Sequence, residues 1–290
     1  MMFEEFARSY GLIIREVIPH RWVSTPTEDH PQKRNGRYKF LGDVGWVQNW
    51  ATMHKPEIWK SSSPTSIQPT SSQILREEWE KRQKAAIAAS YRAMSVLNRT
   101  VRSCHPYLQS KGFNGRKDNV WVAHDHTFLV IPMMFESALC GVQLINEQGK
   151  KKFLRGQRTK GAFKKIDAKG IPIFCEGYAT ALSVRAVMRF IKLRYCIYVC
   201  FSAGNIETVA RGIPDGIVIA DNDPNGVGEQ AARHTNKPYW LSDTVGEDFN
   251  DYHRRVGVEK AAESLKTILP PVMFSEQSEK FRLDLPHSLP

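Results

Sequence analysis

The sequence is poor in cysteine and has no long apolar run. Its 290 residues include five cysteines, an odd number, and no two of them form a Cys-x-x-Cys pair. A structural zinc ribbon and a disulfide framework are therefore not expected, which favours a reducing cytoplasm. No stretch reaches about 18 apolar residues, so no membrane partner is expected. The first residues carry acids and lack a cleavage site, so no secretory signal is expected either.

Positive charge is concentrated in one part of the chain. Hydrophobic residues make up 41% of the sequence, which excludes disorder over most of its length. Residues 74–170 hold 19 Lys and Arg against 8 Asp and Glu, whereas residues 171–290 hold 13 against 15. The segment 150–165 has eight basic residues and no acid. Such a segment indicates a polyanionic partner, and the alternative is a solvated basic face.

Composition and pattern divide the chain into five segments. We expect a small aromatic and basic N-terminal unit at 1–60, a linker at 61–73, a long helix with a basic mixed α+β subdomain at 74–170, an α/β domain at 171–269 and a tail at 270–290. The linker contains almost only Ser, Thr, Pro and Gln, which leave little to bury. The long helix is expected at 74–99, where helix-forming residues predominate.

Short apolar segments alternate with helix-like segments from residue 171 onward. We expect strands at 171–175, 196–201, 216–220 and 237–241, and helices at 179–192, within 205–212, at 228–235 and at 249–269. Buried strands that alternate with helices are typical of a parallel sheet covered on both faces. In such sheets the ligand site lies beyond the carboxyl ends of the strands.

Acidic residues follow three of these four strands. Glu176 follows the first strand, Asp221 and Asp223 follow the third, and Asp248 and Asp251 come after the fourth. Clustered carboxylates raise one another's pKa unless a cation neutralises them. Hard oxygen ligands suit Mg²⁺ or Mn²⁺. An acidic metal site beside a basic segment is what phosphoryl transfer on nucleic acid requires.

The segment DNDPNG at 221–226 is open to other interpretations. As a calcium-binding EF-hand it fails, because Ala232 stands where a bidentate Glu is required. As a dinucleotide-binding loop it is a weak match, because two carboxylates would repel a pyrophosphate. A phosphatase-type Asp-x-Asp nucleophile stays open on local spacing, although it leaves Glu176 unexplained. Turn-forming Asp and Asn remain an alternative at any single one of these places.

Four segments in order along the chain resemble one known family. They are CEGYATALS (175–183), FSAGN (201–205), IVIADNDPNGVGEQAA (217–232) and EDFNDYH (247–253). Together they resemble the Toprim domain of phage- and plasmid-type DNA primases. The upstream stretch at 105–163 also resembles the segment that precedes Toprim in those proteins, so the resemblance covers about residues 100–268.

The resemblance implies metal-dependent synthesis of short RNA primers on a single-stranded DNA template. It implies ribonucleoside triphosphates as substrates, Mg²⁺ or Mn²⁺ as cofactor, and possible cooperation with a separate replicative helicase in a bacterial cell or phage-infected host. Glu176, Asp221 and Asp223 match the catalytic and metal-binding acids, and Asp248 matches a further metal-site acid. The residues expected to bind nucleic acid or nucleotide are Lys151, Lys152, Arg155, Arg158, Lys160 and Lys164.

The sequence departs from the replicative bacterial primases in two respects. Thr180 stands where those proteins often have an acid, which leaves the number of bound ions open. No cysteine precedes Cys104, so their N-terminal zinc module is not expected in this sequence. No phosphate-binding GxxxxGK[ST] loop is present, so no helicase motor is expected. The alternatives are a Toprim-type metal-dependent nuclease and a single-stranded-DNA-binding accessory replication protein.

The N-terminal unit is rich in tryptophan. Four of the seven Trp residues fall within the first 60 residues, interleaved with Lys and Arg. Aromatic rings that alternate with cations are typical of single-strand binding. The alternative is that Trp46 and Trp50 form a small core with Val44 and Val47. The exposure of Trp22 and Trp59 distinguishes the two interpretations.

Overall fold

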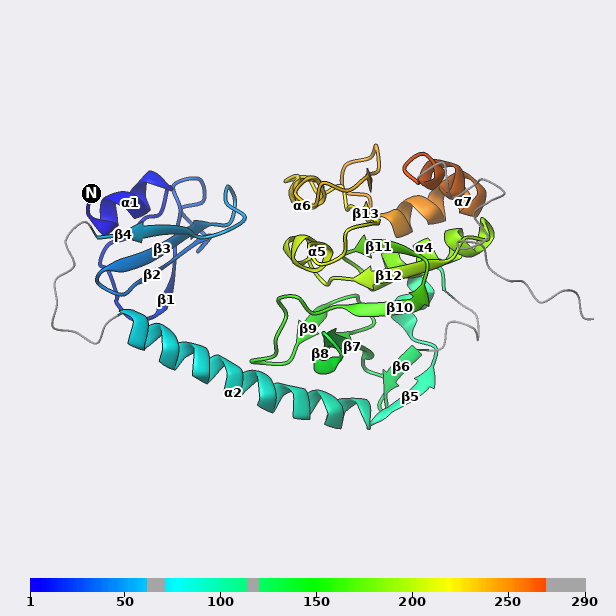
Figure 1. Ribbon diagram of the computed structural model, residues 1–290, viewed down its shortest axis with the longest axis horizontal. Helices are drawn as coiled ribbons and strands as arrows, with labels where there is room; N and C mark the ends of the chain where they lie inside the picture. Colours follow the sequence, from blue (N-terminus) through cyan, green and yellow to red (C-terminus); the bar gives the residue numbers. More distant parts are fainter. Residues whose placement is uncertain (62–70, 114–119, 270–290) are drawn as a thin grey trace, which may run out of the picture. The chain divides into compact units, whose positions relative to one another are not determined.

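The computed structural model describes residues 1–61, 71–113 and 120–269 (Figure 1). The chain divides into two compact units, residues 1–84 and 85–290, and the division falls within a long helix. The expected linker at 61–73 lies largely outside the described residues, and the expected tail at 270–290 lies wholly outside them.

The first unit combines one helix with a four-stranded antiparallel sheet. Its elements are α1 (Phe3–Ser9), β1 (Trp22–Thr25), β2 (Gly36–Phe40), β3 (Val44–Asn49) and β4 (Glu57–Lys60), with strand order β1-β2-β3-β4. β2 and β3 pair antiparallel, and the turn that joins them contains Gly42 and Asp43. Gly42 has φ +94, a conformation that glycine adopts without steric cost.

One face of this sheet forms the core of the first unit. Phe3 of α1 packs against Tyr38, Val47 and Trp59. The ring of Phe3 occupies the space above Gly45, where an added Cβ would lie 2.3 Å from it. Trp59 is only 9% exposed, whereas Trp50 is 46% exposed. The core interpretation is therefore right for Val47 and wrong for Trp46 and Trp50, because the large core aromatics come from α1, β2 and β4 instead.

The second unit begins with the C-terminal part of a long helix and a five-stranded antiparallel sheet. The elements are α2 (Ser71–Leu97), β5 (Thr100–Ser103), α3 (Pro106–Ser110), β6 (Val120–Ala123), β7 (Leu129–Phe135), β8 (Ala138–Ile145) and β9 (Lys151–Phe153). The strand order is β5-β6-β7-β8-β9. Ala93 of α2 packs against Val130 and Val142 on one face of this sheet. The long helix expected at 74–99 is confirmed as α2.

A second sheet in this unit carries the expected parallel strands. Its strands are β10 (Lys164–Lys169), β11 (Ile171–Cys175), β12 (Tyr195–Val199), β13 (Ile217–Ile219) and β14 (Tyr239–Trp240). The order is β10-β12-β11-β13-β14, in which β11 to β14 run parallel and β10 is an antiparallel edge strand. The expectation of a parallel sheet flanked by helices is confirmed. The edge strand β10 is a fifth strand that the sequence analysis does not predict.

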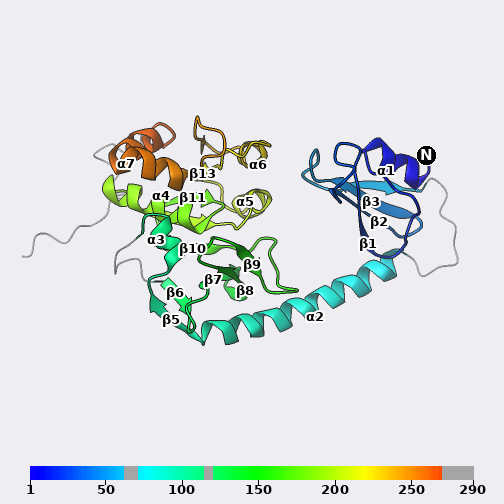
Figure 2. The same cartoon turned by 180° about the vertical axis from the view of Figure 1, so that it is seen from behind.

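Helices cover both faces of this sheet, as Figure 1 and the reverse view in Figure 2 show. The helices are α4 (Tyr178–Phe190), α5 (Ala203–Ala210), α6 (Val227–Arg233) and α7 (Phe249–Lys266). Ile173 belongs to the core that includes α4 and α7, whereas its neighbour Phe174 belongs to the core under α5 and α6. This alternation follows from the two-residue period of a strand. No helix among the described residues is long and apolar enough to cross a membrane.

Asn205 joins the upstream basic segment to the parallel sheet. Its side chain is 8% exposed. The Nδ2 group donates hydrogen bonds of 2.8 Å to the carbonyls of Ala162 and Cys200, and Oδ1 accepts one of 2.7 Å from the Gly161 amide. Three backbone groups therefore form hydrogen bonds with one side chain, that of Asn205 in the segment FSAGN.

Replacing this side chain is expected to destabilise the second unit. Asn205→Ala leaves buried backbone donors and acceptors unpaired, each at a cost of about 1–3 kcal/mol. We expect a loss of about 2–4 kcal/mol in the free energy of unfolding, measured by urea titration. Asn98→Ala, which changes an exposed side chain, should stay within about 0.5 kcal/mol of the parent. Equal stabilities for the two variants would contradict the conclusion that Asn205 joins the basic segment to the parallel sheet.

Candidate functional site

Carboxylates from three connections meet at the carboxyl edge of the parallel sheet. Glu176 directly follows β11, Asp221 and Asp223 follow β13, and Asp248 is the N-cap of α7 after β14. The ladder between β11 and β12 continues past the strand ends, because the Phe201 amide donates a 3.0 Å hydrogen bond to the Glu176 carbonyl. The backbone of Glu176 is therefore held by the sheet itself.

The charges at this edge act on one another. Burial raises the pKa of Asp221 to about 7, and the negative charges of Glu176, Asp248 and Asp223 add to the effect. Burial is also the main cause of the raised pKa of Glu176, with a contribution from Asp223. Lys151 of β9 opposes both shifts. The expected acidic edge therefore has a cation from the basic segment beside it.

One oxygen of Asp221 has no partner. Its Oδ1 atom is buried and accepts no hydrogen bond from the described residues. Buried polar atoms in folded proteins are nearly always paired with protein or water. An unpaired carboxylate oxygen among other acids indicates a place for a bound cation.

A close backbone contact positions Asp221. Gly226, with φ +69, is the N-cap of α6 and turns the chain back toward β13. A Cβ added at Gly228 would lie 2.1 Å from the carbonyl oxygen of Asp221. Only glycine allows the first turn of α6 to approach this closely. The two glycines of DPNGVG thus position the acid.

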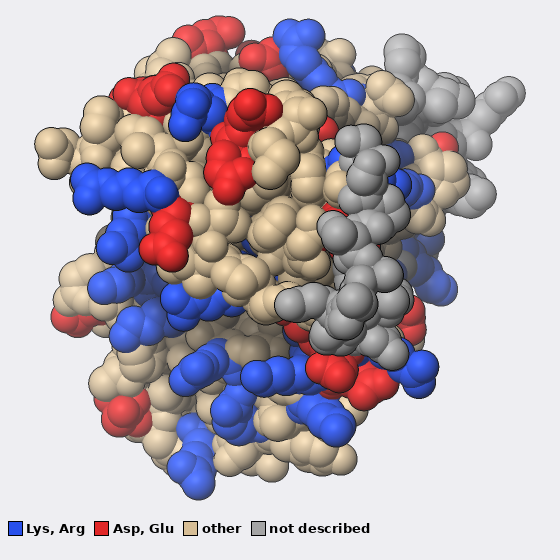
Figure 3. All heavy atoms as spheres, turned by 90° about the vertical axis from the view of Figure 1, so that its left-hand side faces the viewer, with Lys and Arg blue, Asp and Glu red and all other residues tan. Residues whose placement is uncertain are grey.

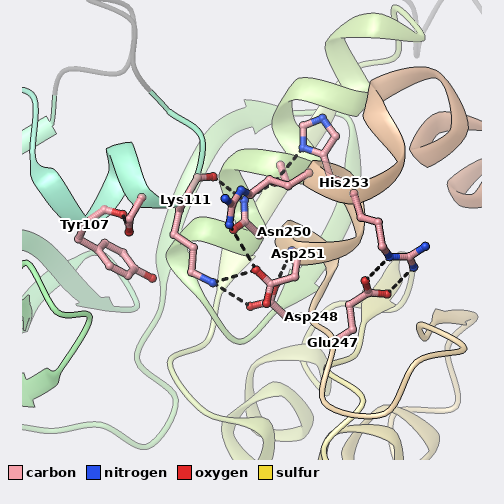
Figure 4. A network of polar contacts seen from close by, with 11 residues as sticks. Tyr107, Lys111, Glu247, Asp248, Asn250, Asp251 and His253 are labelled. Atoms are coloured by element: carbon pink, nitrogen blue, oxygen red, sulfur yellow. Dashed lines mark hydrogen bonds and ion pairs between the residues drawn. The ribbon is translucent and has the colours of Figure 1, made fainter.

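Asp248 and Asp251 lie beside a lysine that sequence reasoning missed. The Nζ atom of Lys111 lies 3.2 Å from Oδ1 of Asp251 and 3.9 Å from Oδ2 of Asp248 (Figure 4). Asp248 also accepts a 2.8 Å hydrogen bond from the Asp251 amide as the cap of α7. Burial raises the pKa of the nearby Tyr107 to about 12, and the two Asp charges add to it. No local pattern points to Lys111, because its partners lie about 140 positions away in the sequence.

Asn250 and Glu247 hold the start of α7. Asn250 is fully buried and donates hydrogen bonds to the Lys111 carbonyl at 3.0 Å and to Ser183 of α4 at 2.9 Å (Figure 4). Glu247 forms two hydrogen bonds with Arg255, at 2.7 and 2.8 Å. The segment EDFND therefore contains structural residues as well as an edge carboxylate, a difference that residue type alone does not reveal.

The six expected basic residues extend from the start of β9 to the start of β10. Lys151 acts on the acidic edge, whereas Lys152 lies over the ring of Phe128 at 5.7 Å. The guanidinium of Arg158 lies 3.3 Å from the centre of the Phe135 ring. Arg155 and Lys160 are exposed.

Lys164 differs from the other five, because it is partly buried. Burial and the nearby charge of Arg102 lower its pKa. The structure therefore brings one of the six basic residues, Lys151, within electrostatic reach of the acids. Lys and Arg side chains are also widespread on the face of the molecule drawn in Figure 3.

The donor set fits a divalent cation. In the described part of the chain, no three Asp, Glu, His or Cys side chains lie together as a ready-made metal cluster. Mg²⁺ does not need such a cluster, because it is usually bound through one or two carboxylates and keeps water or phosphate oxygens elsewhere. Asp221 offers a buried, unpaired oxygen, and the neighbouring groups are hard oxygen donors. Thr180, which stands where the replicative bacterial primases often have an acid, is only 1% exposed within α4.

The fold and the edge of acids define a recognised domain class. Residues 172–259 match the family described as the Toprim domain. These residues are therefore a Toprim domain, and the resemblance to Toprim primases of the phage and plasmid type is confirmed.

Individual relatives are distant. The chain is 24% identical over 206 residues to DNA primase TraC of Escherichia coli, a match that covers 68% of this chain and 14% of the relative's length. A solved structure of the bacteriophage T7 lagging-strand DNA polymerase, interacting with primase domains of two gp4 subunits bound to an RNA/DNA hybrid and dTTP, is also similar. That match has 13% identity and a TM-score of 0.40, and covers 57% of this chain and 87% of the other.

Filling the space at Gly228 is expected to disturb the acidic edge. Gly228→Ala forces α6 away from the Asp221 carbonyl, and overpacking of this kind costs about 1–3 kcal/mol. We expect a corresponding drop in the free energy of unfolding in urea. Gly204→Ala in α5 is the control, because an added Cβ meets nothing within 4 Å there. A Gly228→Ala variant as stable as the Gly204→Ala variant would contradict the close contact.

Proposed function

We propose that this chain is a DNA primase, a nucleotidyltransferase that joins ribonucleoside triphosphates into short RNA primers on single-stranded DNA. The observation that carries the proposal is the edge of the Toprim domain, where Asp221 keeps a buried, unpaired oxygen among Glu176, Asp223 and Asp248. The distant similarity to a DNA primase supports the same reaction class. We place this reaction in phage or plasmid replication, in the cytoplasm of a bacterial or phage-infected cell.

The acids at this edge are proposed to hold Mg²⁺ or Mn²⁺. Glu176, Asp221 and Asp223 would provide the ligands, and Asp248 would contribute if its contact with Lys111 loosens. A bound cation of this kind activates an attacking hydroxyl and screens phosphate charge. Burial is the main cause of the raised pKa values of Glu176 and Asp221, and neighbouring negative charges add to it, so a bound cation would stabilise the charged form of both acids.

The basic residues are proposed to bind the template and the nucleotide. Lys151 lies near enough to influence Glu176 and Asp221, so it is suited to a triphosphate at the acidic edge. Arg155, Arg158 and Lys160 are exposed and suit the sugar-phosphate backbone of the strand. Lys152 and Lys164 are assigned to the same basic surface. A separate replicative helicase is the expected protein partner.

Asp221→Asn is expected to abolish primer synthesis without unfolding the chain. The variant keeps the shape of the side chain but removes a charged ligand. Partners in the outer shell of metal sites are worth about 10- to 100-fold, so the loss of a ligand should cost more than about 100-fold. The measurement is the yield of short labelled RNA on single-stranded DNA with Mg²⁺ or Mn²⁺.

Asp243→Asn is the matched control for this experiment. Asp243 is an exposed acid of the same domain, so its variant should keep full activity. Addition of EDTA should remove activity from the parent and the control alike. Undiminished synthesis by Asp221→Asn would disprove the assignment of the site. DNA that becomes shorter while no RNA forms would instead identify a Toprim nuclease.

Neutralising the exposed basic residues is expected to flatten the salt dependence of DNA binding. Each phosphate contact with a single strand contributes about 0.7 to the slope of log K against log salt. Replacing Arg155, Arg158 and Lys160 with Gln should therefore reduce the slope by up to about 2 in fluorescence anisotropy titrations. A triple variant at Lys192, Lys260 and Lys266 is the control. Identical slopes for both triple variants would show that 155–160 does not contact the strand.

A further inference from the structure

The sheet of the first unit has a second face that its core does not use. Val23, Tyr38 and Val47 lie in the core with α1. Because side chains alternate along a strand, their neighbours Trp22, Lys39 and Trp46 lie on the opposite face. The register pairs Trp22 with Lys39 and Lys39 with Trp46, so these three residues form one row across three strands.

A pocket of about 310 Å³ opens on this face. Trp22, Lys39 and Trp46 of the sheet form one side. The other side comes from the first part of α2, and its residues are Leu75, Glu78, Trp79 and Arg82. Trp79 is 62% exposed. Ligand pockets have volumes of about 300–1,000 Å³, so this pocket has room for one planar ring system.

The charges of this face favour an anionic ligand. Lys39 is 2% exposed and is already paired with Glu78. Glu78 lies 4.0 Å from Arg82, whose side chain is 69% exposed. Arg37 donates hydrogen bonds to the amide oxygen of Gln48, at 3.1 and 2.8 Å, rather than to a carboxylate of the described residues. One acid, Glu78, therefore lies among three cations, which are Lys39, Arg82 and Arg37. This excess of positive charge argues against an aromatic cage that binds a cationic ligand.

The aromatic rings continue beyond the pocket. The guanidinium of Arg37 lies 4.5 Å from the centre of the Trp22 ring and 5.5 Å from that of Trp50. Trp50 is 46% exposed and does not line the pocket. Rings and cations therefore continue from the pocket through Trp22 and Arg37 to Trp50. This pattern favours a strand over a free nucleotide.

We propose that this face binds single-stranded nucleic acid, with one unpaired base inserted among Trp22, Trp46 and Trp79 and the adjoining phosphates held by Arg37 and Arg82. The bases must be unpaired, because a duplex hides the ring faces that stack on tryptophan. Trp59, buried in the core, has no part in it. The site belongs to the first unit alone and does not require the reaction proposed for the Toprim domain.

Photocrosslinking of the full chain tests this site directly. The probe is a 20-nucleotide single strand containing 5-iodouracil, without metal ions or ribonucleotides, and the crosslinked peptides are identified by mass spectrometry. Crosslinks are expected on peptides that contain Trp22, Trp46 or Trp79. Crosslinks confined to residues 85–290 would overturn the proposal.

Trp79→Ala is the decisive variant, because Trp79 is exposed on a helix and alanine favours a helix. Stacking of one base on an aromatic ring is worth about 5- to 150-fold in affinity, so crosslinking to the first unit should fall by at least about 5-fold. Trp79→Phe should restore much of it. Tyr91→Ala, which removes an exposed ring of α2 that does not line the pocket, is the control and should crosslink like the parent.

Two further crosslinking experiments distinguish single-stranded nucleic acid from two other ligands, a duplex and a free nucleotide. A duplex of the same sequence should crosslink poorly, and equal crosslinking by the duplex would overturn the proposal. Free 5-iodo-dUMP should not label these peptides at the same concentration, and equal labelling would identify a nucleotide site instead of a strand site. Asp221→Asn is expected to crosslink like the parent, so a failure of this proposal is seen separately from a failure of primer synthesis.

Discussion

Asp221 follows β13 with one oxygen buried and unpaired, surrounded by the negative charges of other strand ends. This unfavourable electrostatic arrangement explains much of the surrounding structure. Parallel strands deliver their connections to one edge, so the acids after β11, β13 and β14 are brought together by topology. Gly228 lets α6 approach the Asp221 backbone, so the chain cannot relax away from the cluster. The cost of this arrangement without a cation supports the cation site proposed here.

The cations around this edge come from parts of the chain that precede the Toprim domain. Lys151 extends from β9 and moderates the pKa of Glu176 and Asp221, whereas Lys111 follows α3 and contacts Asp248 and Asp251. Both sheets of residues 85–290 share one hydrophobic core. The upstream segment is therefore a structural part of the site, since it sets the charge that the acids experience. The side chain of Asn205 joins the connection between β9 and β10 to the parallel sheet through hydrogen bonds to the backbone of Gly161, Ala162 and Cys200.

The acidic edge could be predicted from sequence because it depends on local order: a buried strand, then an acid, repeated along the chain. The contact between Lys111 and Asp251 could not, because it joins residues about 140 positions apart that no periodic pattern relates. The tryptophans of the first unit show a second limit. Alternation predicts that Trp46 and Val47 lie on opposite faces, but it does not tell which face α1 covers. Only the position of Phe3 decides that Val47 and Trp59 are core residues.

The two proposed nucleic-acid surfaces depend on different physical forces. The segment 151–164 would bind through charge. Such binding weakens steeply as the salt concentration rises, because the release of counterions then contributes less free energy. The Trp22, Trp46 and Trp79 pocket would act mainly through stacking and burial of a base, which salt affects far less. Affinity that persists at high salt and needs unpaired bases would therefore originate in the first unit. Affinity that disappears with salt would originate in the basic segment, so a salt titration separates the two contributions in the intact chain.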